Sequence, residues 1–157
     1  MTTKSALLKG MGQAAIVLSS ANAHSYEKRN SVLEMYINNN MKPQSLDMSA
    51  DSIMYMFGDN YYEGWTEFLT KYNRPPYLNS DEIGSISFGM GGDGSGVPFH
   101  RHGAVFAEIL HGHKRWYLYP KGTPEPPLSH PNQTSQFWTL KNYESLAANE
   151  LPMECGR

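Results

Sequence analysis

The sequence predicts a single domain of the α+β class, mainly β, built as an antiparallel barrel or jelly roll with helices flanking it on the N-terminal side. Three observations predict it. Aromatic residues, which strands favour, form 12% of the 157 residues. Ten prolines and fourteen glycines divide the chain into short segments. Helical periodicity lies mostly within residues 1–80, and closely spaced strand candidates fill residues 81–157.

The N-terminal part opens with an expected strand over residues 13–19, which carries a continuous apolar run. A helix is expected over residues 31–38, where apolar residues recur at helical spacing. Ser31 is its candidate N-cap, and Glu34 follows three residues later, as in a capping box. This part therefore alternates strand and helix.

Residues 53–57 form a short apolar stretch that predicts a further strand. Residues 62–72 predict a helix, because four large apolar side chains share one helical face. These side chains are Trp65, Phe68, Leu69 and Tyr72. Two consecutive prolines at 75–76 end the helix.

The second half is expected to supply the barrel strands. Residues 83–88 alternate in polarity, and a glycine-rich turn follows over residues 90–96. Three more strands are expected over residues 97–102, 104–110 and 114–119. Four strands at such close spacing favour an antiparallel sheet that curls into a barrel.

The remaining segment is less regular. Residues 123–132 are proline-rich and predict a loop. Residues 136–140 predict a further strand or an insert, and residues 143–148 a short helix.

Charge and cysteine content exclude several classes of protein. The net charge of −2 gives no electrostatic case for binding nucleic acid or an anionic membrane. Cys155 has no partner for an internal disulfide. No apolar run is long enough to span a bilayer.

A pair of histidines is the strongest candidate for chemistry. His100 and His102 are two residues apart on an expected strand, so both imidazoles would share one face and bind one transition metal. Glu108 is the nearest carboxylate downstream. It either completes the metal site or forms an ion pair with Lys114 or Arg115 on the neighbouring strand.

Two further residues are candidate sites. The Lys114 ammonium would hold the distal carboxylate of a keto acid, or it is a lysine that protects a strand edge. Asn132 begins an Asn-Gln-Thr triplet in a polar loop, which is an acceptor pattern for N-glycosylation.

The same residues carry a family resemblance. The run Gly94-Ser-Gly-Val-Pro-Phe-His-x-His-Gly, followed by Gly-x-Lys-Arg-Trp-x-Leu-Tyr-Pro ending at Pro120, resembles the cupin-like JmjC family. The similarity extends from about residue 10 to 155 and includes six further segments. These are residues 19–26, 57–60, 65, 75–76, 87–89 and 130–134.

The resemblance implies a double-stranded β-helix that binds Fe(II) through His-x-Asp/Glu and a distal histidine, and that uses 2-oxoglutarate and O₂. His100 matches the first ligand. His102 stands where the family has a carboxylate, which is a departure. Lys114 matches the lysine that binds 2-oxoglutarate, although its spacing from His100 is one residue short. Val97 replaces a threonine that contacts 2-oxoglutarate in some members.

Family members continue past residue 155 into strands that carry the distal histidine. This sequence ends at Arg157 and has no evident leader. We therefore expect a partial JmjC domain, an incomplete double-stranded β-helix, and a chain that is a truncated product, fragment or isoform.

The resemblance leads to two hypotheses. In the first, the chain is a non-catalytic JmjC-like interaction or regulatory module of the endoplasmic reticulum lumen, which binds protein partners or a second copy of itself. In the second, it is an Fe(II)- and 2-oxoglutarate-dependent protein oxygenase with an atypical His-x-His motif, His102 or Glu108 replacing the usual carboxylate. Under the second hypothesis the chain binds both Fe(II) and 2-oxoglutarate, and under the first it binds neither. Without a leader, the alternative location is the cytoplasm.

Overall fold

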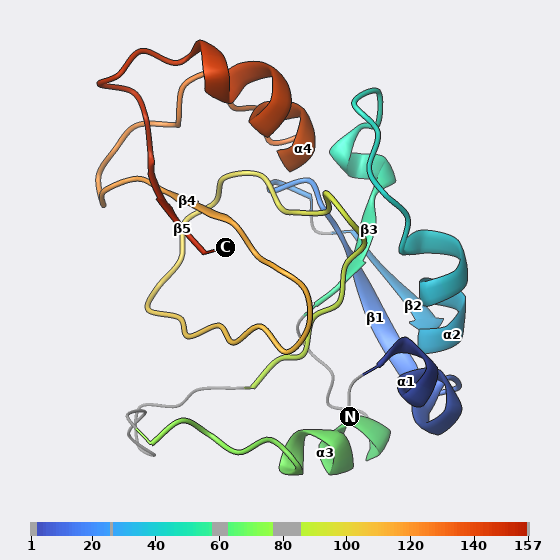
Figure 1. Ribbon diagram of the computed structural model, residues 1–157. Coiled ribbons are helices and arrows are strands. Elements are labelled where there is room, and N and C mark those ends of the chain that lie inside the picture. The colour runs from blue at the N-terminus through green and yellow to red at the C-terminus, as the bar shows by residue number, and fades with distance from the viewer. Residues whose placement is uncertain (1–2, 26, 58–62, 77–85, 157) are drawn as a thin grey trace.

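The computed structural model describes residues 3–25, 27–57, 63–76 and 86–156 (Figure 1). Helices and short strands are mixed in the order α1 (Lys4–Met11), β1 (Ala15–Ser20), β2 (Lys28–Val32), α2 (Leu33–Met35), η1 (Tyr36–Asn40), η2 (Ala50–Ser52), β3 (Met54–Met56), α3 (Glu63–Thr70), β4 (Trp116–Leu118), α4 (Ser135–Phe137), η4 (Trp138–Asn142), η5 (Tyr143–Ser145) and β5 (Met153–Cys155). The segments η1 and η4 are π-helical, and η2 and η5 are 3₁₀ turns.

The first sheet has the strand order β2-β1-β3, with both neighbours antiparallel to β1. Leu18 at its centre lies opposite Arg29 of β2 and Met56 of β3. Every second residue of β1 is buried, including Ile16 and Ser20, so one face of the strand packs on the core.

The main core lies between this sheet and the helices beside it. Trp65 of α3 is fully buried, and its indole Nε1 donates to the Ala15 carbonyl at 2.8 Å. Its ring stacks on Phe88 and meets Phe68 edge-on, with centroids 5.7 and 5.6 Å away. Other buried members are Leu7, Ile16, Leu18, Leu33, Tyr36, Ile37, Met54 and Met56. Trp65 therefore ties α3 to β1 by both packing and a hydrogen bond.

The C-terminal part is built around a second aromatic cluster. Trp138 of η4 packs edge-on against Phe99 and Tyr117, with ring centroids 4.8 and 5.1 Å away. Strands β4 and β5 form a separate antiparallel pair, in which Tyr117 lies opposite Glu154. In Figure 1 the long irregular loop that leads to β4 connects this part to the first sheet.

Several predicted elements are confirmed. The strands expected over 13–19, 53–57 and 114–119 appear as β1, β3 and β4, and residues 123–132 form the expected loop. The helix expected over 31–38 begins later, because β2 runs to Val32, and it continues as a π-helix to Asn40.

The helix predicted over residues 62–72 appears as α3, and the short helix over 143–148 as the 3₁₀ turn η5. Strand β2, strand β5 and helix α1 have no counterpart in the prediction. Each has at most eight residues, so its hydrophobic pattern is weak.

Two strand predictions are wrong, and of the two alternatives for residues 136–140 the strand is not found. Residues 97–102 and 104–110 are irregular, and residues 101–115 are exposed. A strand needs a neighbour for its backbone groups, and the described residues place none beside this segment. Residues 136–140 are helical, because Thr134 caps α4 by accepting from the Phe137 amide.

The strand predicted over 83–88 lies partly outside the described residues. Residues 86–88 are not a strand, and a single bridge joins Met90 to Met56. The boundary expected between residues 80 and 81 also lies outside the described part. A mixed α+β architecture is present, but the described residues do not form a complete jelly roll.

The β4–β5 pair is held by a polar network that predicts a pH dependence. The Tyr143 hydroxyl donates to Glu154, and Arg115 donates to the same carboxylate at 2.6 and 2.9 Å. These bonds hold the pKa of Glu154 below its ordinary value of 4.5. A lowered carboxyl pKa stabilises the fold above the unfolded-state pKa, and the stabilisation is lost as the pH falls through the folded-state pKa.

Replacing Glu154 by Gln should therefore lower the melting temperature by a constant amount above about pH 5, with the difference shrinking below about pH 4. Thermal unfolding of both proteins across this range measures it. Glu144→Gln is the control, since Glu144 is an exposed carboxyl on η5. A difference between Glu154→Gln and the unsubstituted chain that stays the same down to about pH 3 would contradict the assignment.

Candidate functional site

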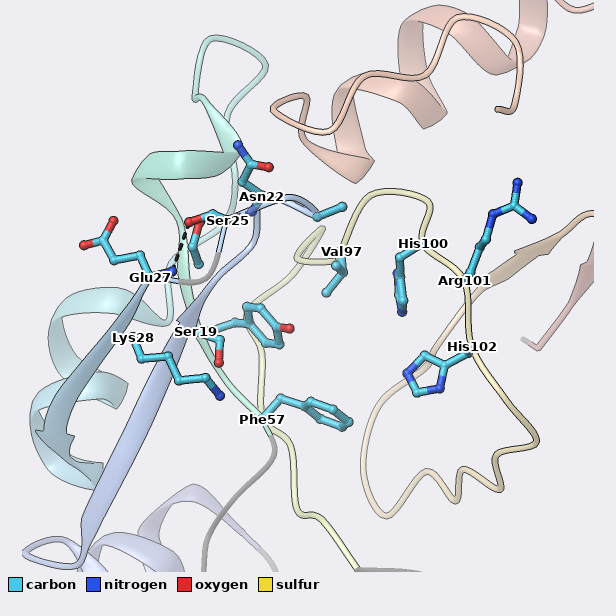
Figure 2. A pocket seen from close by; sticks show the side chains of 13 residues that line it. Ser19, Asn22, Ser25, Glu27, Lys28, Phe57, Val97, His100, Arg101 and His102 are labelled. Atoms are coloured by element: carbon cyan, nitrogen blue, oxygen red, sulfur yellow. Dashed lines mark hydrogen bonds between the residues drawn. The ribbon is translucent and has the colours of Figure 1, made fainter. Parts of the chain in front are cut away.

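A pocket of about 360 Å³ separates the first sheet from the loop that carries the histidine pair (Figure 2). The turn from β1 into β2 forms one wall and loop 97–102 the other. The lining residues are Ser19, Ser20, Asn22, Ala23, Ser25, Glu27, Lys28, Tyr55, Phe57, Val97, His100, Arg101 and His102.

His100 and His102 come together as predicted, although they do not lie on a strand. Their ring centroids are 5.2 Å apart, with the ring planes inclined by 70°. Figure 2 shows both rings on the pocket side of the loop, while the Arg101 side chain extends away from them. The Arg101 guanidinium donates to the Thr123 carbonyl at 3.4 Å. Although the backbone is irregular here, the two histidine side chains lie on the same side of it, as the alternation predicts.

A glycine-rich turn that precedes loop 97–102 holds this loop in place. Gly94 adopts φ of +69°, and a Cβ there would lie 2.3 Å from the Gln136 side-chain oxygen. A Cβ at Gly96 would lie 2.9 Å from the Ser135 side chain. Phe99 then packs against Trp138. The sequence therefore fixes the loop by close approach to α4 and η4.

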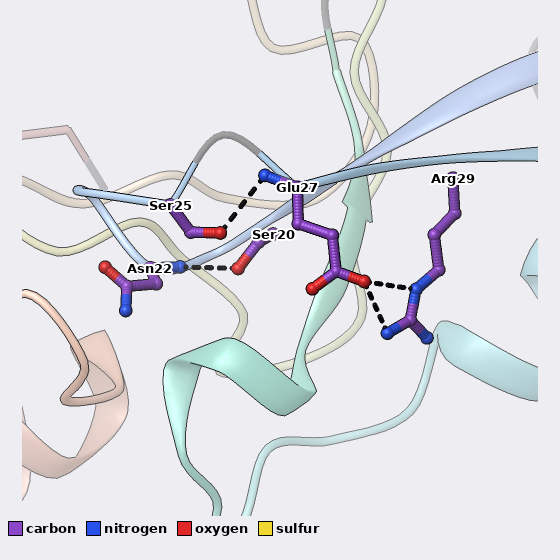
Figure 3. A network of polar contacts seen from close by, with 5 residues as sticks. All are labelled: Ser20, Asn22, Ser25, Glu27 and Arg29. Atoms are coloured by element: carbon purple, nitrogen blue, oxygen red, sulfur yellow. Dashed lines mark hydrogen bonds and ion pairs between the residues drawn. The ribbon is translucent and has the colours of Figure 1, made fainter.

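The wall opposite the histidines is a network of short polar contacts (Figure 3). Ser20 Oγ accepts from the Asn22 amide at 3.2 Å, and Ser25 Oγ accepts from the Glu27 amide at 3.1 Å. The Glu27 carboxylate accepts from Arg29 at 2.6 and 2.7 Å. Sequence reasoning gave this wall no role, although residues 19–26 were among the segments that matched the family.

Glu108 lies away from the histidines. Its carboxylate accepts from the Tyr72 hydroxyl at 2.5 Å, and it is not among the pocket-lining residues. Arg115, one of its two expected ion-pair partners, pairs with Glu154 instead. Glu108 therefore joins the loop to the segment after α3 in the described residues.

Lys114 also lies outside the pocket lining. Its ammonium lies 4.1 Å above the Trp116 ring, in a cation–π contact. Desolvation by burial lowers the pKa of this amine from its ordinary value. Val97, by contrast, lines the pocket beside the histidines, with an apolar side chain.

The donor set for a metal is thus two imidazoles. No group of three or more His, Cys, Asp or Glu side chains suited to one metal ion is found within the described ranges. Fe(II) with 2-oxoglutarate needs two histidines and a carboxylate around the iron. The described residues do not assemble that set, because His102 replaces the carboxylate and Glu108 is bound elsewhere.

The side-chain oxygens of Asn132 and Thr134 in the glycosylation triplet are bound within the chain. Asn132 Oδ1 accepts from Ser49 Oγ at 2.6 Å and from the Asp51 amide at 2.9 Å. Thr134 is 2% exposed and caps α4. In the folded chain these two residues join the turn at 49–51 to the start of α4.

The chain is similar in sequence to proteins from several mammals that are all named "JmjC domain-containing protein 8". Against "JmjC domain-containing protein 8" from Rattus norvegicus it is 40% identical over 150 residues, which covers 95% of this chain and 55% of the relative. Against the Homo sapiens protein of that name it is 36% identical over 156 residues, covering 99% of this chain and 58% of the relative. This chain therefore spans somewhat more than half the length of these relatives.

A more distant similarity is to "Lysine-specific demethylase JMJ21" from Arabidopsis thaliana, at 32% identity over 109 residues, which covers 60% of this chain and 11% of that protein. No family model and no solved structure matches the chain. In the described part, no helix is both long and apolar enough to cross a bilayer. The residue matches confirm the resemblance seen in the sequence: across nearly its whole length, the chain is homologous to JmjC domain-containing protein 8.

Proposed function

We propose that this chain is a non-catalytic, JmjC-like protein-interaction and regulatory module of the endoplasmic reticulum lumen. The observation that carries the proposal is an exposed apolar run in the loop before β4. Val105, Phe106, Ile109 and Leu110 are each between 43% and 58% exposed. Large apolar side chains gathered on a surface are typical of protein-binding sites.

The candidate metal and cofactor ligands support the same proposal. In the JmjC family, one iron ion and one keto acid require their ligands in a single pocket. Here His100 and His102 line the pocket, while Glu108 and Lys114 have partners outside it. The four candidate ligands therefore do not converge in the described chain.

The lumenal location rests on the family resemblance and on the Asn132 triplet. Treating the protein from cells with an endoglycosidase tests it, and a mobility shift that disappears in Asn132→Asp supports the proposal. This variant keeps the side-chain oxygen that accepts from Ser49 and Asp51. If the electrophoretic mobility did not change and the protein were found in the cytosolic fraction, the lumenal assignment would be overturned and the cytoplasmic alternative supported.

The partner that is simplest to test is a second copy of the chain. Sedimentation velocity over a range of concentrations should show reversible association. The double variant Phe106→Asp/Ile109→Asp should weaken it at least tenfold, because each change puts a charge into an apolar contact. Leu140→Asp is the matched control, since Leu140 is 53% exposed but lies on η4, outside the run.

The module is supported if the unsubstituted chain and Leu140→Asp both self-associate and the double variant does not. A chain that is monomeric at every concentration, or equal behaviour of all three proteins, contradicts the role of the apolar run in self-association.

The second candidate is an Fe(II)- and 2-oxoglutarate-dependent protein oxygenase, and the neighbouring imidazoles of His100 and His102 favour it. Metal analysis of the purified chain, with 2-oxoglutarate consumption measured alongside, separates the two proposals. Near-stoichiometric iron that is lost in His100→Ala and kept in His113→Ala would favour the oxygenase. His113 is exposed and outside the pocket lining. Iron below about a tenth of an equivalent, without turnover, favours the module.

A further inference from the structure

We propose that copies of this chain dock head to tail, with the apolar run 105–110 of one copy on residues 144–153 of the next. This inference rests on the proposed function, because it names the partner surface for the same run. Each of the two surfaces combines exposed apolar side chains with charged groups, and the two sets of charges have opposite signs. Contact between two different surfaces of the same chain makes a heterologous interface.

The run is restrained in an exposed position. Its one carboxylate, Glu108, accepts from the Tyr72 hydroxyl at 2.5 Å, which ties the run to the segment after α3. Val105 is nevertheless 58% exposed, Ile109 45% and Leu110 47%. Because the hydrogen bond restrains the run before a partner arrives, less conformational freedom is lost when the apolar side chains are covered.

Basic side chains flank the run on both sides. Arg101 precedes it, and Lys114 and Arg115 follow it. Arg115 is paired with Glu154, whereas the Lys114 ammonium lies over the Trp116 ring. The Arg101 guanidinium donates to a backbone carbonyl, which has no net charge. Within the described chain, the charges of Arg101 and Lys114 are therefore left without a carboxylate partner, and a partner surface with carboxylates suits them.

Residues 144–153 form an acidic surface of this kind. They contain two glutamates and no Lys, Arg or His. Glu144 is exposed and Glu150 is half-buried. Leu151 and Met153, in the same segment, are 46% and 66% exposed. This acidic surface therefore offers both the apolar side chains and the carboxylates that the run and its flanks lack.

The run and the acidic surface lie at different places on the molecule. In Figure 1 the loop with the run forms the lower edge of the C-terminal part, residues 146–152 lie at its upper left, and the β4–β5 pair lies between them. A two-fold contact of the run with itself would bring the basic flanks of both copies together. Head-to-tail docking instead brings basic groups to carboxylates, so the charges favour it.

Mixing two defective variants tests this arrangement by sedimentation velocity. Phe106→Asp/Ile109→Asp damages the run, and Leu151→Lys/Met153→Lys damages the acidic surface. Each variant alone should self-associate at least tenfold more weakly than the unsubstituted chain, because each change puts a like charge against the opposite surface. An equimolar mixture should form a one-to-one complex, because each variant keeps the surface that the other has lost.

The mixture also controls for folding, since an unfolded variant could not supply its remaining surface. Met35→Lys is the matched control for the second variant, because Met35 is 53% exposed but lies on α2, and it should associate normally. Raising the salt concentration from about 0.05 to about 0.5 M should weaken association of the unsubstituted chain, because salt screens the exposed charges.

Two results would overturn the inference and leave the proposed function standing. In the first, the unsubstituted chain associates through the run, but Leu151→Lys/Met153→Lys associates equally well. In the second, both variants are monomeric and their mixture stays monomeric. A chain that is monomeric at every concentration would contradict both the inference and the role of the run in self-association.

Discussion

Replacing Trp65 by alanine is expected to cost about 3–5 kcal/mol of unfolding free energy, the usual range for an aromatic side chain deleted from a core. The indole is fully buried, contacts the rings of Phe68 and Phe88, and donates to the Ala15 carbonyl. Alanine would leave a cavity between α3 and the sheet and an unpaired carbonyl on β1. Since small domains have about 5–15 kcal/mol in total, much of the stability would be lost. Urea unfolding followed by circular dichroism measures the change.

Trp65→Phe is the matched control. It keeps an aromatic ring in the core and removes the indole N–H, so the loss should be smaller, about 1–3 kcal/mol for the unpaired Ala15 carbonyl. Equal losses in both variants would show that the hydrogen bond, and not the packing, dominates. No loss in either would mean that α3 does not pack on the sheet as described.

Replacing Gly94 by valine should have the second largest effect. A β-branched residue at φ of +69° is strained by roughly 1–3 kcal/mol, and the end of the Gln136 side chain, 2.3 Å from the new Cβ, would have to move away from the turn. Because this turn holds loop 97–102 against α4, we also expect the contact between the His100 and His102 rings to change. Urea unfolding measures the first effect, and the nuclear Overhauser signal between the two rings measures the second.

Gly103→Val supplies the comparison. Gly103 follows the same histidine pair, yet a Cβ there meets nothing within 4 Å and its φ is not in the left-handed region. It should leave the unfolding free energy nearly unchanged. If the two glycine variants behaved alike, the turn would not be the element that places the histidine loop.

Much of the N-terminal half could be predicted from its pattern. Strand β1 lies in a continuous apolar run and helix α3 has apolar residues at helical spacing, and both pack on the same core. The second half could not be predicted in this way. Residues 104–110 have a strand-like sequence, but a strand also needs a neighbour, and that depends on contacts far away in the chain.

The candidate site, too, could be predicted only in part from the sequence. The spacing of His100 and His102 predicted that their rings would lie together, and the structure places them 5.2 Å apart although the segment is not a strand. Spacing could not show that Glu108 would accept from Tyr72, 36 residues earlier in the chain, or that Lys114 would lie over Trp116. These partners are set by how the loop folds back on other elements.

The amino-acid sequence by itself determined the family resemblance, the mixed α+β class and the histidine pair, because each depends on residues close together in the chain. Only the tertiary structure decided which polar groups share a pocket, which side chains stay exposed, and that the Gln44 amide is buried without a partner in the described chain. The physical reason is that burial and hydrogen bonding depend on every neighbour in space, and most of those neighbours are distant in sequence.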